Sequence, residues 1–466
     1  MAGGTFTKLN KRRPGAYINV KAPTRKQATT RASRGLMLYL AKSAAEWGKD
    51  GVISLTADSD LKKVLGTDIY TLTDFTGANL TFLGLREAFR VTDAVLYYNV
   101  NKGAKAAYED PSLPWTFQAK YGGLKGNEIK ITVIKDPTTP QVTVVTYFGT
   151  EQVNRQVVAT ASQLVSNDYV DVTVTDAAKA DDGKDLLDKL VATTTATLTG
   201  GTTAKGSGSD DTTIADVIDT IETTAFDVLA ITPDANITLH KLMVSAVTRL
   251  REEVGKKVTL VIPDNVALSV DYEGITLVAN GVILSDGTEL SPAVAAVYVA
   301  AASAAVALNQ SLTYAVYQNA ASVAGKLNDD NTIAALNAGK LVFTQRNDGV
   351  VVIEQDINSL HTFTDDKRSD LQKNRIIRAL DTIAEDTKET FESSFIGKIT
   401  NNAAGRDLFK SNRVSFLIGL QDQGVIADFV ADDIDVRAGE EPDQVIVDLA
   451  FTPTDAMEKL YMTMTV

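Results

Sequence analysis

The 466-residue chain contains no cysteine. This absence excludes a disulfide framework, a thiolate metal site and a cysteine nucleophile, and it is consistent with folding in a reducing cytoplasm. Histidine is almost as scarce, with only His240 and His361 in the whole chain. Any Ser–His–Asp triad or imidazole metal site must use one of these two, and neither belongs to an HExxH motif or a histidine cluster. We therefore expect both histidines to be structural or surface residues.

Nucleotide and cofactor motifs are also missing. The segments "AGKL" and "IGKI" contain Gly–Lys but lack the upstream glycine and the Ser or Thr of a phosphate-binding loop. No G-x-S-x-G nucleophile elbow occurs, and acidic stretches such as "LNDDNT" lack the alternating ligand spacing of a calcium loop. We expect no catalytic, cofactor-binding or metal-binding residue and no enzyme activity. An enzyme of the α/β hydrolase type with a β-sandwich binding insertion stays open as an alternative, because the central part of the chain alternates strand-like and helix-like segments. Carboxylate-only active sites can also be hidden in any acidic protein.

Long hydrophobic runs are absent with one partial exception, residues 290–325, which contain no charged residue. Alanine dominates this stretch and polar residues interrupt it, whereas a membrane span needs about 20 predominantly apolar residues. We interpret residues 292–308 as a buried helix, capped by Ser291 and with Pro292 at its first position. The basic N-terminus is followed by no apolar segment, so we expect neither a signal peptide nor a membrane partner.

The net charge of −13 argues against a protein that coats nucleic acid, so we expect no direct nucleic-acid partner. The charge is unevenly distributed. Residues 1–50 hold eleven Lys and Arg against two acidic residues, and residues 422–443 hold eight acidic residues against one Arg. Either these are two solvated surfaces, or the basic start of one copy pairs with the acidic segment of another. The second interpretation involves Lys11, Arg12, Arg13, Asp432, Asp433 and Asp435.

Sequence patterning divides the chain into several parts. Residues 1–20 form an arm rich in glycine and charge. Residues 21–100 and 205–360 alternate strand-like with helix-like segments, which indicates a central α/β domain with a largely parallel sheet. Residues 101–204 contain alternating segments such as "EIKITVI" and "QVTVVTYF". These are typical of an inserted β-sandwich, here ending in a flexible linker rich in Thr, Gly and Ser.

Residues 361–466 combine two helical segments, "NRIIRALDTIAEDTKETFESSF" and "GRDLFKSNRVSFLIGLQDQG", with the alternating segment "QVIVDLAF". This pattern indicates an α+β C-terminal domain. Residues 43–49, a charged stretch between two strand-like segments, look helical. The expected fold class is therefore α/β plus an all-β insertion, with an α+β C-terminal domain and extended terminal arms.

Both ends of the chain carry an alternating segment with no partner strand nearby in the sequence. Such a strand beside a chain end is a candidate for pairing with a neighbouring subunit. The N-terminal segment consists of Ala16, Tyr17, Ile18, Asn19 and Val20. The C-terminal segment consists of Leu460, Tyr461, Met462, Thr463, Met464, Thr465 and Val466. The sequence therefore indicates that both segments pair outside their own neighbourhood, with another subunit as one candidate.

Several segments, in order along nearly the whole chain, resemble contractile phage tail sheath proteins, particularly those of Gram-positive phages and prophages. The segments are "RRPGAYINVKA", "LTFLGLREAFR" followed by "AVLYYNV", "TFQAKYGGLKGNEIKITV", "KVTLVIPD" and "NRIIRALDTIAEDTKETFESSFIGKITNNAAGRDLF". No single segment is diagnostic, but their order is specific. A tail tube protein is a less suitable alternative, because tube proteins are typically small β-barrels.

The resemblance implies a structural subunit that polymerises into a helical sheath around a tail tube and contracts to drive the tube through a cell envelope. It implies a central domain of subtilisin-like topology without the protease's catalytic residues. It also implies that the terminal arms, at residues 16–20 and 460–466, complete a small sheet in neighbouring subunits. In such proteins the C-terminal domain faces the tube and the β-insertion projects outward.

The same resemblance sets the expected partners and location. The partners are further copies of the chain, the tail tube protein, and the baseplate and tail terminator proteins. The location is the tail sheath of a virion or of a headless, bacteriocin-like particle, assembled in the bacterial host cytoplasm.

Overall fold

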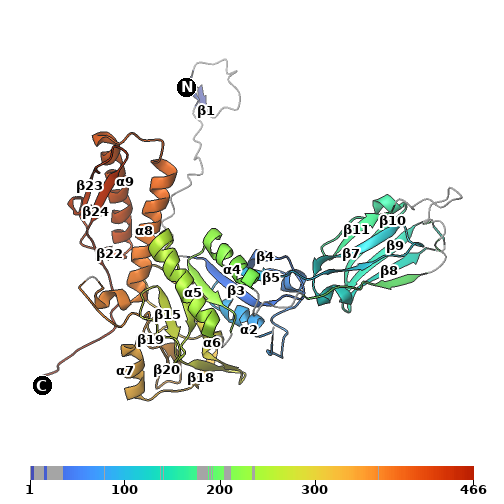
Figure 1. Cartoon of the computed structure of the whole chain (residues 1–466), viewed down its shortest axis with the longest axis horizontal. Helices are drawn as coiled ribbons and strands as arrows, with labels where there is room; N and C mark the ends of the chain where they lie inside the picture. The colour runs from blue at the N-terminus through green and yellow to red at the C-terminus, as the bar shows by residue number, and fades with distance from the viewer. Residues whose placement is uncertain are drawn as a thin grey trace.

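A central, mostly parallel sheet organises the computed structural model of the chain (Figure 1). Its strand order is β19-β15-β14-β13-β3-β5-β4, and all neighbours are parallel except the edge pair β4–β5. The strands are β3 (Met37–Ala44), β4 (Gly51–Thr56), β5 (Ala94–Val100), β13 (Val228–Ile231), β14 (Thr259–Pro263), β15 (Ile275–Val278) and β19 (Lys340–Leu341). The structure describes residues 2–4, 15–17, 35–77, 79–136, 138–139, 141–175, 187, 190, 193–203, 211–233, 237–365 and 367–465.

Helices cover both faces of this sheet, and strand β3 shows why. Successive side chains of a strand point to opposite faces. Met37 and Tyr39 join the core beneath α2 and α6, whereas Leu38 and Leu40 join the core beneath α4 and α5. Burial on both faces accounts for the nearly continuous apolar runs of the parallel strands. The helices are α2 (Asn79–Ala88), α4 (Asp211–Thr223), α5 (Ile237–Arg249) and α6 (Pro292–Ala305).

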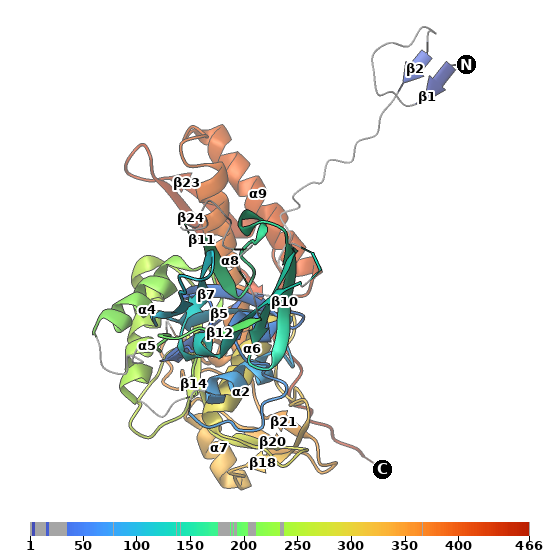
Figure 2. The ribbon, with the colours of Figure 1, turned by 90° about the vertical axis from the view of Figure 1, so that its right-hand side faces the viewer.

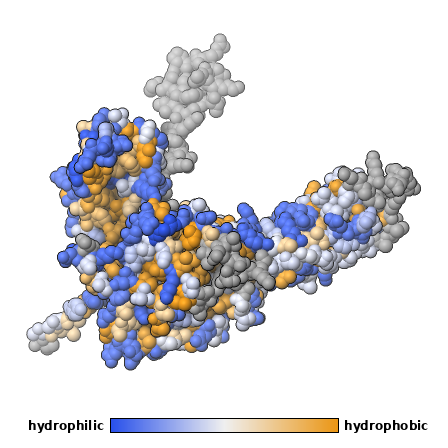
Figure 3. Space-filling model, viewed as in Figure 1, coloured by the Kyte–Doolittle hydropathy of each residue, from blue (hydrophilic) through white to orange (hydrophobic). Residues whose placement is uncertain are grey.

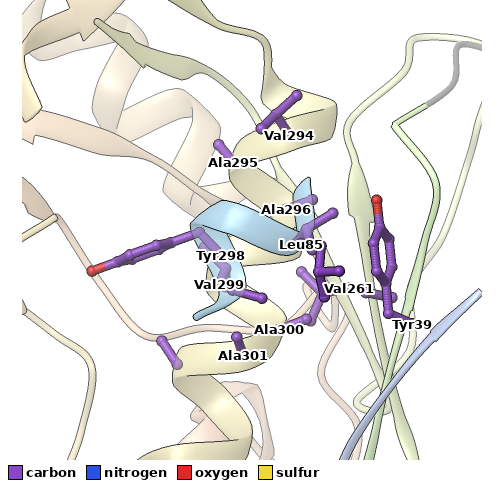
Figure 4. Packing of buried hydrophobic residues seen from close by; sticks show 14 of the residues in the cluster. Tyr39, Leu85, Val261, Val294, Ala295, Ala296, Tyr298, Val299, Ala300 and Ala301 are labelled. Carbon is purple, nitrogen blue, oxygen red and sulfur yellow. The ribbon is translucent and has the colours of Figure 1, made fainter. Parts of the chain in front are cut away.

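Helix α6 is the predicted Ala-rich helix, and it is buried along almost its whole length. Its alanines lie close to Leu85 of α2 and Val261 of β14, where larger side chains would hold the elements apart (Figure 4). Ser291 occupies the N-cap position and Pro292 the start of the helix, as predicted, but the Ser291 side chain makes no capping hydrogen bond. The fixed φ of Pro292 starts the helix without it. Among the described residues, no helix is long and apolar enough to cross a membrane.

Smaller elements complete the central domain. A three-stranded sheet in the order β17-β16-β18 and the hairpin β20–β21 lie beside it. Gly349 turns the hairpin with φ of 86°, a conformation that glycine adopts without strain. The elements are α1 (Leu61–Leu65), β16 (Gly281–Leu284), β17 (Glu289–Leu290), β18 (Ala320–Ala324), α7 (Asp329–Asn337), β20 (Phe343–Gln345) and β21 (Val351–Ile353).

The inserted domain is a sandwich of two antiparallel sheets, in the orders β10-β9-β8-β12 and β11-β7-β6. It projects away from the central domain (Figure 1). Its core is built from inward-facing residues of both sheets, among them Trp115, Phe117 and Ile131. The strands are β6 (Lys105–Tyr108), β7 (Trp115–Gly122), β8 (Ile129–Lys135), β9 (Val142–Phe148), β10 (Glu151–Val158), β11 (Val170–Val174) and β12 (Thr194–Thr197).

The stretch at residues 43–49 joins the central domain to the sandwich. We expected a helix here, and that expectation is wrong, because β3 runs to Ala44 and bends follow. The Trp47 ring enters the sandwich core, with centroids 5.3 Å from Tyr121 and 5.1 Å from Phe148. Its indole N–H donates to the Lys63 carbonyl at 2.9 Å. Burial by a domain distant in sequence therefore decides the conformation of this stretch.

The C-terminal domain consists of helices α8 (Asn374–Ser394) and α9 (Ala403–Asp422) with two small sheets. Figure 2 shows these helices rising from the central domain. The first half of α8 is buried, and its later part joins α9. The small sheets pair β22 (Ile426–Ala427) with β25 (Thr452–Pro453), and β23 (Ile434–Ala438) with β24 (Val445–Leu449).

Candidate assembly surfaces

The hairpin β23–β24 stands on the C-terminal helices and has one apolar face. Ile434 is buried, and Val436 and Leu449 pack on the same small core that contains Leu417 of α9. The opposite face carries charge: Asp435 lies across from Asp448, and both pair with Arg437. These two carboxylates raise the pKa of Arg437 above its usual value, the Asp448 hydrogen bond contributing most.

Both outer edges of this hairpin are available for a further strand. The Gly439 N–H donates to the Gln444 carbonyl at 3.0 Å, and the Ala450 N–H donates to the Asp433 carbonyl at 2.9 Å. Backbone groups alternate in direction along a strand. The N–H and C=O groups of the pairs Asp435–Asp448 and Arg437–Ile446 therefore also face inward, between the two strands. The outward groups then belong to Ile434, Val436 and Ala438 on β23 and to Val445, Val447 and Leu449 on β24. Within the described residues, neither edge pairs with another strand.

The acidic residues predicted for charge pairing lie at the start of this hairpin. Asp432 is exposed, whereas one carboxylate oxygen of Asp433 accepts the Val430 N–H at 2.8 Å. Asp435 is 3.0 Å from Arg437, so part of its charge is already compensated. Lys11, Arg12 and Arg13 lie outside the described residues, and their pairing with these acids stays a prediction.

The N-terminal segment is only partly described. Strand β2 (Gly15–Tyr17) contains Ala16 and Tyr17 and pairs in parallel with β1 (Ala2–Gly4) of the same chain. The expectation that this segment has no partner strand nearby in the sequence is therefore wrong. The partner was missed because Ala2–Gly4 has no alternating pattern. Ten residues separate the two strands. Ile18, Asn19 and Val20 lie outside the described residues, so strand exchange at this end stays a prediction.

The C-terminal segment stands clear of the body of the molecule (Figure 3). Residues 460–465 form no strand within the single chain. Their large apolar side chains are exposed, Tyr461 at 89%. Apolar side chains on a soluble surface indicate a contact site when they are gathered together. The exposed members are Leu460, Tyr461, Met462 and Met464; Thr463 and Thr465 lie between them, and Val466 is outside the described residues.

Just before this segment, Glu458 holds the chain against the central domain. Its carboxylate accepts the Thr313 hydroxyl at 2.9 Å and the Gln355 amide at 3.3 Å, and it pairs with Lys373. The Glu458 side chain is only 9% exposed. Sequence reasoning missed this anchor, since a single Glu in a polar stretch has no distinguishing pattern.

Helix α8 is fixed to the central domain by buried ion pairs. Two N–H groups of Arg251 donate to both carboxylate oxygens of Asp381, at 2.8 and 2.9 Å. Arg378 donates to Asp356 at 2.8 Å. Burial alone would raise the pKa of Asp356, but Arg378, the Leu312 N–H and the Asn374 amide lower it below its usual value. The bidentate, buried pair Arg251–Asp381 restricts the orientation of α8.

The two histidines lie in different surroundings. His240 is buried in α5. His361 is partly exposed, with its Nδ1 2.8 Å from the Ser359 carbonyl and 3.4 Å from Asp271. The Ser359 hydroxyl donates instead to the Tyr272 carbonyl at 2.9 Å. The described residues contain no group of three or more His, Asp or Glu placed to hold a metal ion. These contacts give His361 and Ser359 no catalytic arrangement with each other.

Comparison with known proteins identifies the class. Three family models match: the phage tail sheath beta-sandwich domain at residues 101–209, the central domain at 208–359 and the C-terminal domain at 366–466. The phage-like element PBSX protein XkdK of Bacillus subtilis is 33% identical over the full length of both chains. The chain therefore belongs to the phage tail sheath family, as the resemblance predicted, and is a structural subunit of that class.

Solved structures agree with this assignment. The sheath tail protein of Desulfitobacterium hafniense is 31% identical, with a TM-score of 0.74 over 96% of this chain and 99% of its own. The sheath tail protein of Listeria innocua is 32% identical, with a TM-score of 0.75 over 93% and 94%. The contracted helical sheath of the anti-feeding prophage shares only 12% identity at a TM-score of 0.56, over 97% and 98%. That last likeness concerns the fold alone.

Proposed function

We propose that this chain polymerises into a contractile helical sheath around a tail tube and that strand exchange links its copies. The observation that carries the proposal is the two-stranded hairpin β23–β24 with both edges unpaired among the described residues. A two-stranded sheet is marginal on its own and gains stability from further strands. An added strand contributes main-chain hydrogen bonds along the whole edge.

The two edges match the two predicted arms in number. One arm contains residues 16–20, and the other contains residues 460–466. In the proposed assembly each hairpin receives one arm on each edge, both from other copies. The exposed apolar side chains of the C-terminal segment support this role, because an added strand buries alternate side chains against the inner face.

The buried pairs Arg251–Asp381 and Arg378–Asp356 support a contraction in which each copy moves as one unit. They hold the central and C-terminal domains together, so the proposed movement takes place between copies rather than within one. Strand pairing through the terminal arms survives such a rigid-body rotation. The extended sheath is then a metastable assembly that stores the energy released on contraction, and the mechanism requires no nucleotide.

The remaining expectations belong to the same proposal. The central domain has a subtilisin-like topology, the C-terminal domain faces the tail tube, and the sandwich points outward. The domains are residues 1–20, 21–100 with 205–360, 101–204 and 361–466. The partners are the tail tube, baseplate and terminator proteins. The particle, a virion or a bacteriocin-like tail, is assembled in the host cytoplasm.

Electron microscopy of the purified full-length protein tests the proposal. We expect hollow tubes or rings, together with a sedimentation coefficient that increases steeply with protein concentration. A protein that stays strictly monomeric at every concentration and salt tested would contradict the proposed assembly.

A further inference from the structure

The tip of the C-terminal domain contains an apolar groove that strand pairing at the hairpin edges does not require. It has a volume of about 510 Å³ and lies between the end of α8, the start of α9 and the turn of β23–β24. Val445, at the beginning of β24, belongs to its wall, so the groove lies at the turn end of that strand. The apolar lining comes from Phe391, Phe395, Ile396, Ile399, Phe409 and Val445.

Three aromatic rings form the rigid part of this groove. Phe395 lies 5.0 Å from Phe409 and 6.2 Å from Phe391, and Phe391 lies 5.5 Å from Phe409, all measured between ring centroids. Ile396 and Ile399 stand beside them with 56% and 39% of their surface exposed. Aromatic faces and edges bind methionine sulfur favourably, and the unbranched Met side chain adapts to irregular cavities.

The exposed C-terminal segment of the chain has the matching chemistry. It presents Leu460, Met462 and Met464 at alternate positions, and all three are largely exposed. In an extended strand, alternate side chains point to the same side. A strand added along the edge of β24 would therefore direct the leucine and the two methionines to the face that carries the Val445 side chain, and the side chains nearest the turn would enter the groove.

The segment does not reach the groove of its own chain in the structure. Glu458 is bound to Lys373, which precedes α8. Phe391 lies 18 residues further along that helix, about 27 Å away at 1.5 Å per residue. Residue 464 lies six residues beyond Glu458, so it reaches about 22 Å even when fully extended. The C-terminal end also points away from the β23–β24 hairpin (Figure 1).

We propose that the groove binds residues 460–464 of a second copy of this chain, and that the Glu458 anchor keeps the occupant intermolecular. The inference rests on the proposed arm exchange and adds to it a side-chain docking site that strand pairing does not require. In this proposal the C-terminal arm pairs with the β24 edge of the hairpin, and the N-terminal arm pairs with the β23 edge.

Disulfide trapping tests this arrangement directly, because the chain has no native cysteine. Full-length Ile399→Cys protein is mixed with full-length Leu460→Cys, Met462→Cys or Met464→Cys protein, assembled and mildly oxidised. Only contacts between copies can link two such single-cysteine chains, and a bond requires Cα atoms within about 7 Å. We expect at least one tail position to give a linked dimer at tenfold or greater yield over the control.

The matched control is Ile333→Cys, the same substitution at a residue that is 49% exposed on α7 of the central domain. Particles that form without any link to Ile399→Cys above this control would overturn the groove inference and leave strand exchange standing. Equal linking to both positions would also overturn it. The absence of particles from wild-type protein would contradict the proposed function itself.

A second measurement uses Ile396→Lys, which places a charge in the groove at an exposed position and so leaves the fold intact. We expect the protein concentration needed for assembly to rise at least tenfold, whereas Ile333→Lys leaves it unchanged. Unaltered assembly of folded Ile396→Lys protein would overturn the inference.

Discussion

Arg251 and Asp381 illustrate how single residues hold the central and C-terminal domains together. Both side chains are almost fully buried, and their two hydrogen bonds join the π-helical turn Leu250–Val254 to α8. A buried pair adds little net stability compared with apolar residues of the same volume, but removing one partner is strongly destabilising. The pair therefore acts mainly by fixing the direction in which α8 leaves the central domain.

Asp381→Ala removes one partner of this pair and leaves the Arg251 charge buried. We expect the free energy of unfolding to fall by about 3–5 kcal/mol, as measured by urea denaturation. Arg346→Ala, which breaks an exposed pair with Asp348, is the control and should cost less than about 1 kcal/mol. Similar losses for the two variants would contradict the structural role given to the buried pair.

Asp356 makes stability depend on pH in a defined direction. Its pKa in the folded chain is lowered, whereas an unfolded Asp titrates near pH 3.9. A lowered pKa contributes stability above the unfolded value, and this contribution is lost as the pH falls through the folded value. We expect the stability difference between wild type and Asp356→Asn to shrink below about pH 4. A difference that stays constant from pH 7 to pH 3 would rule out this coupling.

At the scale of secondary structure, the hairpin β23–β24 has a packed inner face and, within the described residues, two unpaired edges. The inner face is held by Ile434 and its neighbours in the C-terminal core. Exposed edges promote uncontrolled pairing, and proteins usually protect them with charge or short strands. Here each strand has only five residues, which limits pairing to short segments such as the terminal arms.

Val447→Pro tests the β24 edge. The Val447 N–H points outward, so proline at this position removes a donor for an added strand without removing a bond of the hairpin itself. We expect a folded monomer, judged by circular dichroism, whose assembly requires at least about tenfold more protein, equivalent to about 1.4 kcal/mol. Val447→Ala, which keeps the N–H, is the control. Normal assembly of Val447→Pro would exclude strand addition at this edge.

Sequence patterns predicted elements well where the packing partners are local or regular. The alternating "QVIVDLAF" contains β24, and the Ala-rich stretch contains α6. Trp47 shows the limit, because the surrounding charges favoured a helix while a domain far along the chain buries its ring. Glu458 shows a second limit, since its partners Thr313 and Lys373 are brought together only by the fold. Contacts between distant segments have no periodic signal in the sequence.

At the scale of the whole molecule, the chain combines a folded body with a C-terminal segment that leaves its surface. The central and C-terminal domains share helix α8, the sandwich is attached through Trp47, and the C-terminal segment leaves the surface at Glu458. The sheath class itself follows from the family resemblance, which the comparisons confirm.

Deletion of residues 460–466 tests the central claim of assembly through terminal segments most directly. The deletion begins two residues beyond Glu458, so the anchor and the folded body stay complete. Wild-type and shortened proteins are compared at equal concentration by sedimentation velocity and electron microscopy. We predict tubes or rings from the wild type and a folded, soluble monomer from the shortened chain. Tubes of normal length and abundance from the shortened chain would contradict the account.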